Sequence, residues 1–121
     1  MSELRRDPII GRWNIIETDG PAGPAAFEVD TQSLGAGKCP FCYGHEAMTP
    51  PEIHVIRPAG SAANGPNWRL RVVSNKFPAL KIEGDLNRRG VGVFDLCNGV
   101  GAHEVIVETP EHQRQMADLS V

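Results

Sequence analysis

Apolar and polar residues alternate over residues 68–74, and this alternation predicts a half-buried strand. The two alternating sets are Trp68, Leu70 and Val72 on one side and Arg69, Arg71 and Val73 on the other. Because side chains in a strand point alternately to opposite faces, the first set is expected to face a core. Arg69 and Arg71 are then expected on the outer face, where solvated arginines are common.

Other short runs rich in β-branched and aromatic residues predict further strands at 12–17, 52–57, 92–96 and 103–108. Asn98-Gly99 is a dipeptide favoured in tight turns, so the last two runs are expected to pair as an antiparallel hairpin. Residues 19–37 are rich in Gly, Pro and Ala without a period, which is typical of a loop or connector. Residues 58–66 carry turn chemistry.

A helix is expected to begin near residue 109. Thr109 suits the N-cap and Pro110 suits the first helical position. Such a helix would have roughly twelve residues, with His112 on the same face as Met116 and directed toward the protein body. The fold class is therefore predicted to be α+β, mainly antiparallel sheet.

Length and charge limit the possible functions. The 121 residues correspond to about one domain with one core. A net charge of -3 and a pI near 5.8 argue against a nucleic-acid partner. The charged N-terminus and the lack of a long apolar run argue against a signal peptide or a membrane segment, so a cytoplasmic protein is expected. Three cysteines make a disulfide framework a poor explanation, and Cys97 is expected to be a small buried residue.

Cys39 and Cys42 form a Cys-x-x-Cys motif whose two sulfurs can converge on one metal ion. Redox pairs use the same spacing, but they usually lie at a helix N-terminus within a βαβ unit. Here the motif follows a Gly-rich stretch and precedes a Pro-Pro pair at 50–51. The setting favours a metal site, which needs further ligands.

Four histidines compete for the next ligand position. His112 is the best candidate, because the predicted helix directs it inward. His45, three residues after the second cysteine, could bind the same ion, although an exposed loop histidine is the simpler interpretation. His54 is expected to be a sheet residue. His103 could reach a phosphate, but a hydrogen bond within its turn is favoured.

Asn75 directly follows the strand predicted over 68–74. An asparagine amide at a strand end can bond to a ribose or a phosphate, or it can cap a turn. The residues alone leave these alternatives open.

Several separated motifs together resemble the galactose-1-phosphate uridylyltransferase family, which lies within the histidine-triad superfamily. The segments that carry the resemblance are Leu4–Trp13, Cys39-Pro-Phe-Cys42, Gly65–Trp68, Asn75–Leu80 and Ala102–His112. They occur in the order of the family and extend over nearly the whole chain.

The resemblance implies a homodimeric, cytoplasmic enzyme with an antiparallel sheet. Such an enzyme transfers a uridylyl group between UDP-glucose and a hexose 1-phosphate, such as galactose 1-phosphate, through a covalent nucleotidyl-histidine. Cys39, Cys42 and His112 match the family's zinc ligands, and Asn75 matches a residue that contacts the nucleotide.

The resemblance also implies that residues 1–121 are the N-terminal portion of the catalytic domain and end before its catalytic strand. The fourth zinc ligand and the nucleophile of a His-x-His pattern would lie downstream. None of the four histidines stands in that pattern, so no catalytic residue is expected in this chain. An adenylyl-transferring relative and a non-catalytic, zinc-stabilised binding module remain as alternatives, and the role of His45 stays open.

Overall fold

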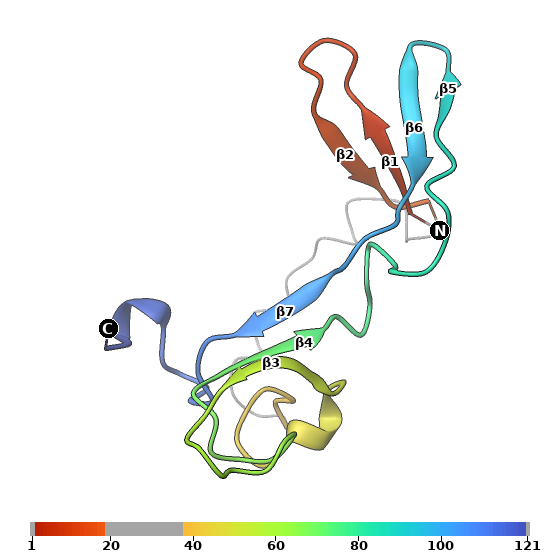
Figure 1. Cartoon of the computed structure of the whole chain (residues 1–121). Coiled ribbons are helices and arrows are strands. Elements are labelled where there is room, and N and C mark those ends of the chain that lie inside the picture. Colours follow the sequence, from red (N-terminus) through yellow and green to blue (C-terminus); the bar gives the residue numbers. More distant parts are fainter. Residues whose placement is uncertain (1, 19–37, 121) are drawn as a thin grey trace. The chain divides into compact units, whose positions relative to one another are not determined.

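The computed structural model describes residues 2–18 and 38–120. The described residues divide into two compact units (Figure 1). Unit 1 contains residues 2–18 and 77–103, and unit 2 contains residues 38–76 and 104–120. Each unit has a sheet of its own. The expectation of one domain with one core stays a prediction. The loop expected over 19–37 lies outside the described residues.

Unit 1 is built on a four-stranded antiparallel sheet with the order β2-β1-β6-β5. Its strands are β1 (Glu3–Arg6), β2 (Trp13–Ile16), β5 (Arg89–Val91) and β6 (Phe94–Asn98). Leu4 in the central β1 faces Ile15 on one side and Cys97 on the other. The predictions of strands near 12–17 and 92–96 are thus confirmed, and Cys97 is buried as expected.

The sequence did not indicate β1, because Leu4 is the only apolar residue of this strand. Its neighbours define it instead: β1 pairs with both β2 and β6. Glu3 also forms ion pairs with Arg5 at 2.5 Å and with Arg89 at 2.9 Å. Tertiary pairing thus overrides the weak β-propensity of the segment.

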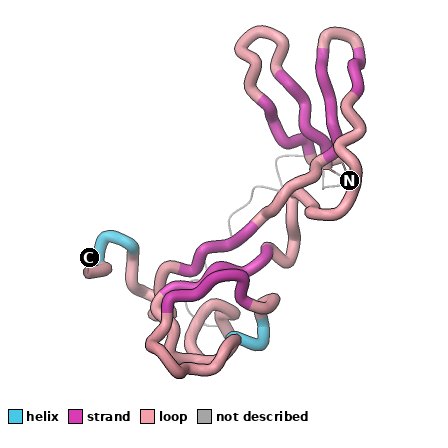
Figure 2. The backbone as a smooth tube through the Cα atoms, in the orientation of Figure 1, coloured by secondary structure: helices cyan, strands magenta, loops and turns pink. Residues whose placement is uncertain are grey.

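Unit 2 contains a three-stranded antiparallel sheet with the order β3-β4-β7. Its strands are β3 (Glu52–Ile56), β4 (Leu70–Ser74) and β7 (Glu104–Val107). Helical structure within the described ranges is limited to two 3-10 turns, η2 (Glu46–Met48) and η3 (Met116–Asp118), as Figure 2 shows. The antiparallel-sheet part of the predicted α+β class is thus confirmed. None of the helices in the described part of the chain has the length and hydrophobicity needed to cross a membrane.

The buried face of β4 is opposite to the one expected from the alternation. Arg71 and Val73 are buried, each with 1% of its surface exposed, while Leu70 and Val72 are only half-buried. Trp68 is buried as well, but it precedes the strand, and Asn67 before it has a positive φ of 67°. This turn takes Trp68 out of the alternation of the strand. The two arginines were both predicted on the outer face, which holds for the exposed Arg69 and is wrong for the buried Arg71.

The predicted hairpin around Asn98-Gly99 is also wrong, because β6 and β7 belong to different sheets. Neither residue has the positive φ that a type I′ turn requires. Gly99 is a glycine for another reason: a Cβ at this position would lie 2.3 Å from Ser2 Oγ and 2.8 Å from Ser2 O. The Gly99 amide donates to that Ser2 carbonyl at 3.0 Å. The glycine therefore permits a close approach between two chain segments rather than a turn.

The helix expected from residue 109 does not form. Thr109 Oγ1 accepts a hydrogen bond from the Glu111 amide at 3.2 Å, and the chain then makes a turn at 112–113. A helix of this length is marginal unless tertiary packing buries its apolar stripe. Met116 remains 65% exposed, so packing does not bury the expected stripe at this residue.

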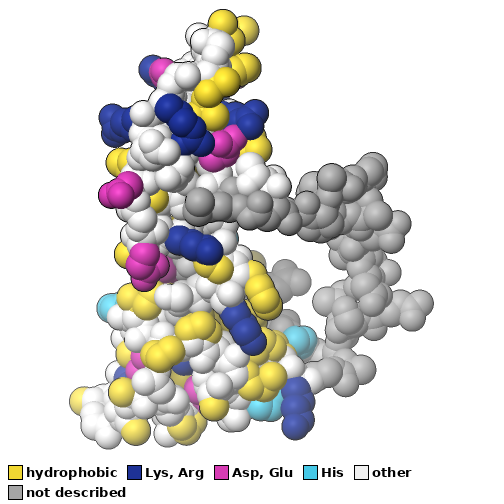
Figure 3. Space-filling view, turned by 90° about the vertical axis from the view of Figure 1, so that its right-hand side faces the viewer, with side chains coloured by type: hydrophobic (Ala, Val, Ile, Leu, Met, Phe, Trp, Pro, Cys, Tyr) yellow, Lys and Arg dark blue, Asp and Glu magenta, His cyan; other side chains and the backbone are white. Residues whose placement is uncertain are grey.

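Both units bury few apolar side chains. The buried hydrophobic residues are Trp68, Val73, Leu96, Cys97 and Val107. Many large apolar side chains are exposed instead, including Ile9, Ile10 and Val93 in the two hairpin turns of unit 1. Figure 3 shows hydrophobic side chains at the surface of this end of the unit. Specific polar contacts must therefore contribute much of the order in each unit.

We expect Gly99→Ala to destabilise the chain by about 1 to 3 kcal/mol, because the added methyl group would overlap the backbone of Ser2. Urea unfolding followed by far-UV circular dichroism measures this loss. The matched control is Gly90→Ala in β5, where a Cβ meets nothing within 4 Å, and its effect should stay below about 1 kcal/mol. Equal unfolding free energies for both variants would contradict the steric explanation.

Candidate metal centre

Cys39 and Cys42 lie in a compact turn that precedes η2. The Cys42 amide donates to the Cys39 carbonyl at 3.4 Å, and the His45 amide donates to the Cys42 carbonyl at 3.2 Å. Gly44 has a φ of +81°, which L side chains rarely adopt, so the second turn depends on glycine. We call residues 39–45 the knuckle. It brings the two cysteine side chains to the same side of the backbone.

Three donor atoms converge at this knuckle. The two cysteine sulfurs and a ring nitrogen of His112 all lie within 4.8 Å of one another, and Cys42 Sγ is 3.4 Å from His112 Nδ1. A tetrahedral zinc ion with usual Zn–S and Zn–N lengths separates a sulfur and a nitrogen by about 3.6 Å. The donor set and its spacing therefore fit a metal ion with a further ligand position.

His112 reaches this cluster by a route other than the one expected. β7 ends at Val107, and the turn at 112–113 rather than a helix carries the imidazole to Cys42. His112 is exposed, whereas the sequence predicted that it faces the protein body. The three donors line a surface groove of about 320 Å³ together with β7, so the cluster is open to solvent.

The proximity of the two thiols affects their chemistry. Burial, and then hydrogen bonding and charge from Cys39, raise the pKa of Cys42 above its ordinary value. Without a cation the Cys42 thiol therefore resists ionisation. Because a metal binds thiolates, binding must release protons, and lower pH should weaken the affinity.

A buried carboxylate attaches the knuckle to the rest of unit 2. Glu46 Oε1 accepts hydrogen bonds from the Trp68 indole at 2.9 Å and from the Gly44 amide at 3.3 Å. Trp68 also contacts the ring of Tyr43, and its carbonyl accepts from the Tyr43 hydroxyl at 3.1 Å. The knuckle is thus bonded on two sides to the residue that leads into β4.

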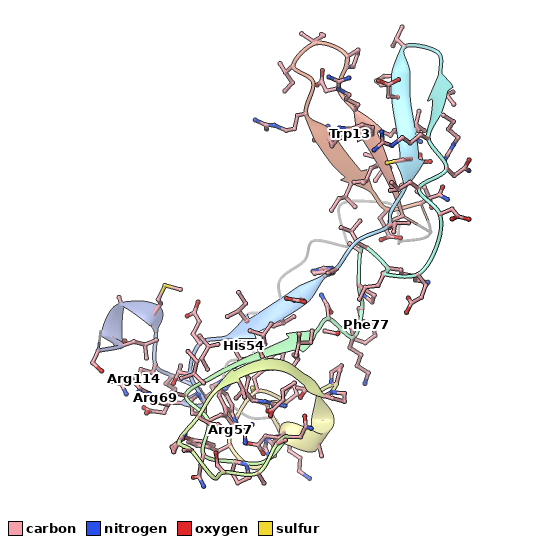
Figure 4. All side chains as sticks on the ribbon, viewed as in Figure 1. Trp13, His54, Arg57, Arg69, Phe77 and Arg114 are labelled. Atoms are coloured by element: carbon pink, nitrogen blue, oxygen red, sulfur yellow. The ribbon has the colours of Figure 1, made fainter. Side chains whose placement is uncertain are left out.

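Arg71 extends this network into the sheet. Its guanidinium lies 5.6 Å from the centre of the Trp68 ring, and Nη1 donates to Thr49 Oγ1 at 3.3 Å. Arg71 Nε is 3.4 Å from Glu52 Oε2, and the same oxygen forms an ion pair with Arg57. Arg57 directly follows β3 (Figure 4). A buried arginine is tolerated when it has such partners.

The network sets the ionisation of Glu46. Burial alone would raise its pKa, but the bonds from Trp68 and from the backbone amides of Glu46 and Gly44, with the charge of Arg71, lower it overall. Glu46 is therefore ionised at neutral pH although only 7% of its surface is exposed.

The other histidines do not join the cluster in the described part of the chain. The Nδ1 atom of half-buried His45 lies 2.6 Å from the Cys39 carbonyl oxygen. His54 is exposed on β3, in agreement with the prediction of a sheet residue. His103 Nδ1 accepts from the Ala79 amide at 2.9 Å, 24 residues earlier in the chain, so this bond joins two distant segments and is not the predicted bond within the turn of His103.

Asn75 is half-buried directly after β4, at the end of the strand as expected. In the β4–β7 ladder Ser74 faces Glu104, while Arg71 faces Val107. Asn75 thus follows one end of the ladder, and the segment to His112 leaves from the other end. The ladder does not bring Asn75 into the metal cluster.

Sequence reasoning missed the parts of the site that support the three donors. A glutamate at 46 and a tryptophan at 68 are far apart in the chain and belong to no periodic pattern. One signal was available: Trp68 directly follows Asn67 and the turn residues of 58–66, so it need not follow the alternation of the next strand.

No family model matches the chain. An ADP-glucose phosphorylase of Arabidopsis thaliana is 33% identical over 122 residues, which cover 97% of this chain and 33% of that protein. A solved GalT-like protein of Arabidopsis thaliana is 31% identical, and the match covers 96% of this chain and 29% of that protein, with a TM-score of 0.48. A crystal structure of an ADP-glucose phosphorylase from Arabidopsis thaliana with bound ADP-glucose is 30% identical, and the match covers 98% of this chain and 32% of that protein, with a TM-score of 0.47. The chain spans about a third of the length of these relatives.

We expect Glu46→Gln to lower the unfolding free energy by about 1.5 to 3 kcal/mol at neutral pH, because it removes the charge from the acceptor of one buried and one half-buried hydrogen bond. The folded pKa of Glu46 lies below its ordinary value of 4.5, so its contribution is complete above that pH and is lost as pH falls through the folded pKa. Denaturant titrations across this acidic range measure both effects.

The matched control for this prediction is Glu104→Gln, an exposed glutamate in β7 of the same unit. It should leave the unfolding free energy within about 0.5 kcal/mol of wild type. If Glu46→Gln behaves like this control, the carboxylate does not hold the knuckle.

Proposed function

Because the chain belongs to the galactose-1-phosphate uridylyltransferase family of the histidine-triad superfamily, we propose that it is the N-terminal portion of an enzyme that transfers nucleotidyl groups between sugar nucleotides and sugar phosphates. The observation that carries the proposal is the Cys39, Cys42 and His112 cluster. These residues match the family's zinc ligands, in a chain related by sequence to a sugar-nucleotide phosphorylase.

The proposed metal is zinc. Two sulfurs and one imidazole nitrogen are ligands that zinc accepts, and a downstream group or water completes the four. When bound, zinc would supply folding energy and a fixed knuckle. The chain's own residues then define the surrounding structure: Glu46 holds the knuckle against Trp68, and β7 leads toward His112.

We expect the purified chain to bind stoichiometric zinc and Cys39→Ser to lose it. Removing one thiolate leaves two of the three donors, which should weaken binding strongly. Cys97→Ser is the matched control, since Cys97 is buried in unit 1 outside the cluster and should leave the zinc content unchanged. Metal analysis after dialysis measures the zinc content. A chelator should lower the melting temperature of the zinc-loaded wild type and leave that of the Cys39→Ser variant unchanged.

The nucleotide donor has two candidates. ADP-glucose is favoured, because the Arabidopsis relative is an ADP-glucose phosphorylase. UDP-glucose with a hexose 1-phosphate as acceptor is the second candidate, supported by the motifs that resemble uridylyltransferases. Both donors lead to the same chemistry: a downstream histidine of a His-x-His pattern attacks the α-phosphorus, the P–O bond to the β-phosphate breaks, glucose 1-phosphate leaves, and the histidine holds the nucleotidyl group. We propose a homodimer for the intact enzyme.

Asn75 is the proposed nucleotide contact, at the end of β4. In the intact enzyme, Asn75→Ala should lower kcat/KM for the sugar nucleotide by roughly two-fold to a hundred-fold, the range for losing a neutral or a charged hydrogen bond. A separate experiment identifies the preferred donor: the intact enzyme is incubated with ADP-glucose or with UDP-glucose, each labelled in the α-phosphate, and the label bound to the protein is measured. Greater labelling from ADP-glucose is the expected result.

Two controls separate the outcomes. The 121-residue chain should remain unlabelled by either donor, since none of its histidines stands in a His-x-His pattern. If Asn75→Ala loses thermal stability while its kinetics stay normal, Asn75 caps a turn and has no contact with the nucleotide. An intact protein that binds zinc but is labelled by neither donor would favour a non-catalytic, zinc-stabilised module.

A further inference from the structure

His45 has an unusual position for a histidine close to two cysteine ligands. Its Nδ1 atom lies 2.6 Å from the carbonyl oxygen of Cys39, six residues earlier in the chain. A carbonyl oxygen can only accept a hydrogen bond, so Nδ1 must carry the proton and donate it. The imidazole is therefore engaged with the backbone of a ligand residue instead of joining the three donor atoms.

The Cys39 carbonyl is the point where the first turn of the knuckle closes. It accepts from the Cys42 amide at 3.4 Å, a long bond, and from His45 Nδ1 at a much shorter distance. The backbone of His45 is itself fixed, because its amide donates to the Cys42 carbonyl and its carbonyl accepts from the Met48 amide at 2.8 Å. His45 thus links Cys39 to the start of η2 through its side chain and to Cys42 through its backbone.

We propose that His45 is a positioning residue of the metal centre that holds the two cysteines at the separation a metal ion requires. This inference rests on the proposed metal site at Cys39, Cys42 and His112. The cluster is open to solvent and its first turn has a weak backbone bond, so the side-chain bond from His45 supplies the missing restraint. Groups that orient metal ligands in this way typically change affinity by about 10- to 100-fold when they are lost.

Two substitutions separate positioning from ligation. The amide nitrogen of asparagine is as many bonds from Cα as Nδ1 of histidine, so His45→Asn can donate to the Cys39 carbonyl. His45→Ala cannot donate, and neither variant retains an imidazole ligand. A positioning role predicts that asparagine preserves the affinity and alanine lowers it. A role as ligand predicts that both substitutions lower it equally.

The test measures zinc affinity of the 121-residue chain by competition with a chromophoric chelator. We expect His45→Ala to bind zinc about 10- to 100-fold more weakly than wild type, and His45→Asn to stay within a few-fold. His54→Ala, on exposed β3, is the matched control and should bind as wild type does. Cobalt substitution adds a second readout: the thiolate-to-cobalt absorption should keep its position and intensity in metal-saturated His45→Ala.

Each contrary result has a distinct meaning. Wild-type affinity in His45→Ala overturns the positioning role and leaves the metal site intact. Equal weakening in both variants, with a changed cobalt spectrum, overturns it in favour of a fourth ligand. A wild-type chain that binds no zinc overturns the metal site of the proposed function, and the role of His45 with it.

Discussion

The carboxylate of Glu46 is the contact on which the order of unit 2 depends. It accepts from the amide of Gly44 inside the knuckle and from the indole of Trp68 ahead of β4, and so joins two segments that are distant in sequence. A small apolar core cannot fix a loop of this kind by itself. The cost of burying the charge is offset by the hydrogen bonds and by Arg71 over the same indole. The sheet and the knuckle therefore form one polar network.

Such a network holds the donors of the metal cluster through contacts of the chain itself. The knuckle is held to β4 through Trp68. β4 pairs with β7, whose C-terminal end leads to His112. The cysteine and histidine donors thus reach the cluster from two directions that meet in the same three-stranded sheet. Preorganisation of this kind lowers the conformational entropy that metal binding has to overcome.

The elements whose physics is local could be predicted from the sequence, and those that depend on distant contacts could not. The Cys-x-x-Cys motif and the strands β3 and β7 can be recognised from residues that are adjacent in the sequence, because the strands consist of β-branched runs. Gly99 shows the limit, because its sequence context suits a hairpin turn while its actual constraint is the backbone of Ser2. Arg71 shows the same limit, since an alternating pattern places it outside, and only the contacts with Trp68 and Glu52 explain its burial. The three donors were predicted together through resemblance, although the helix expected to carry His112 is replaced by a turn.

The position of the metal cluster relative to Asn75 bears on what a bound ion can do. The register of β4 and β7 places the segment to His112 at one end of the ladder and Asn75 after the other. A strand rises about 3.3 Å per residue, so the four paired positions from Arg71 to Ser74 separate the two ends by roughly 10 Å. The three donors of the cluster come from the knuckle and from the segment after β7, and none of them comes from the end of β4 that precedes Asn75. If Asn75 contacts the nucleotide, the ion at Cys39, Cys42 and His112 acts through the fold, by fixing the knuckle and the sheet from which the nucleotide contact extends.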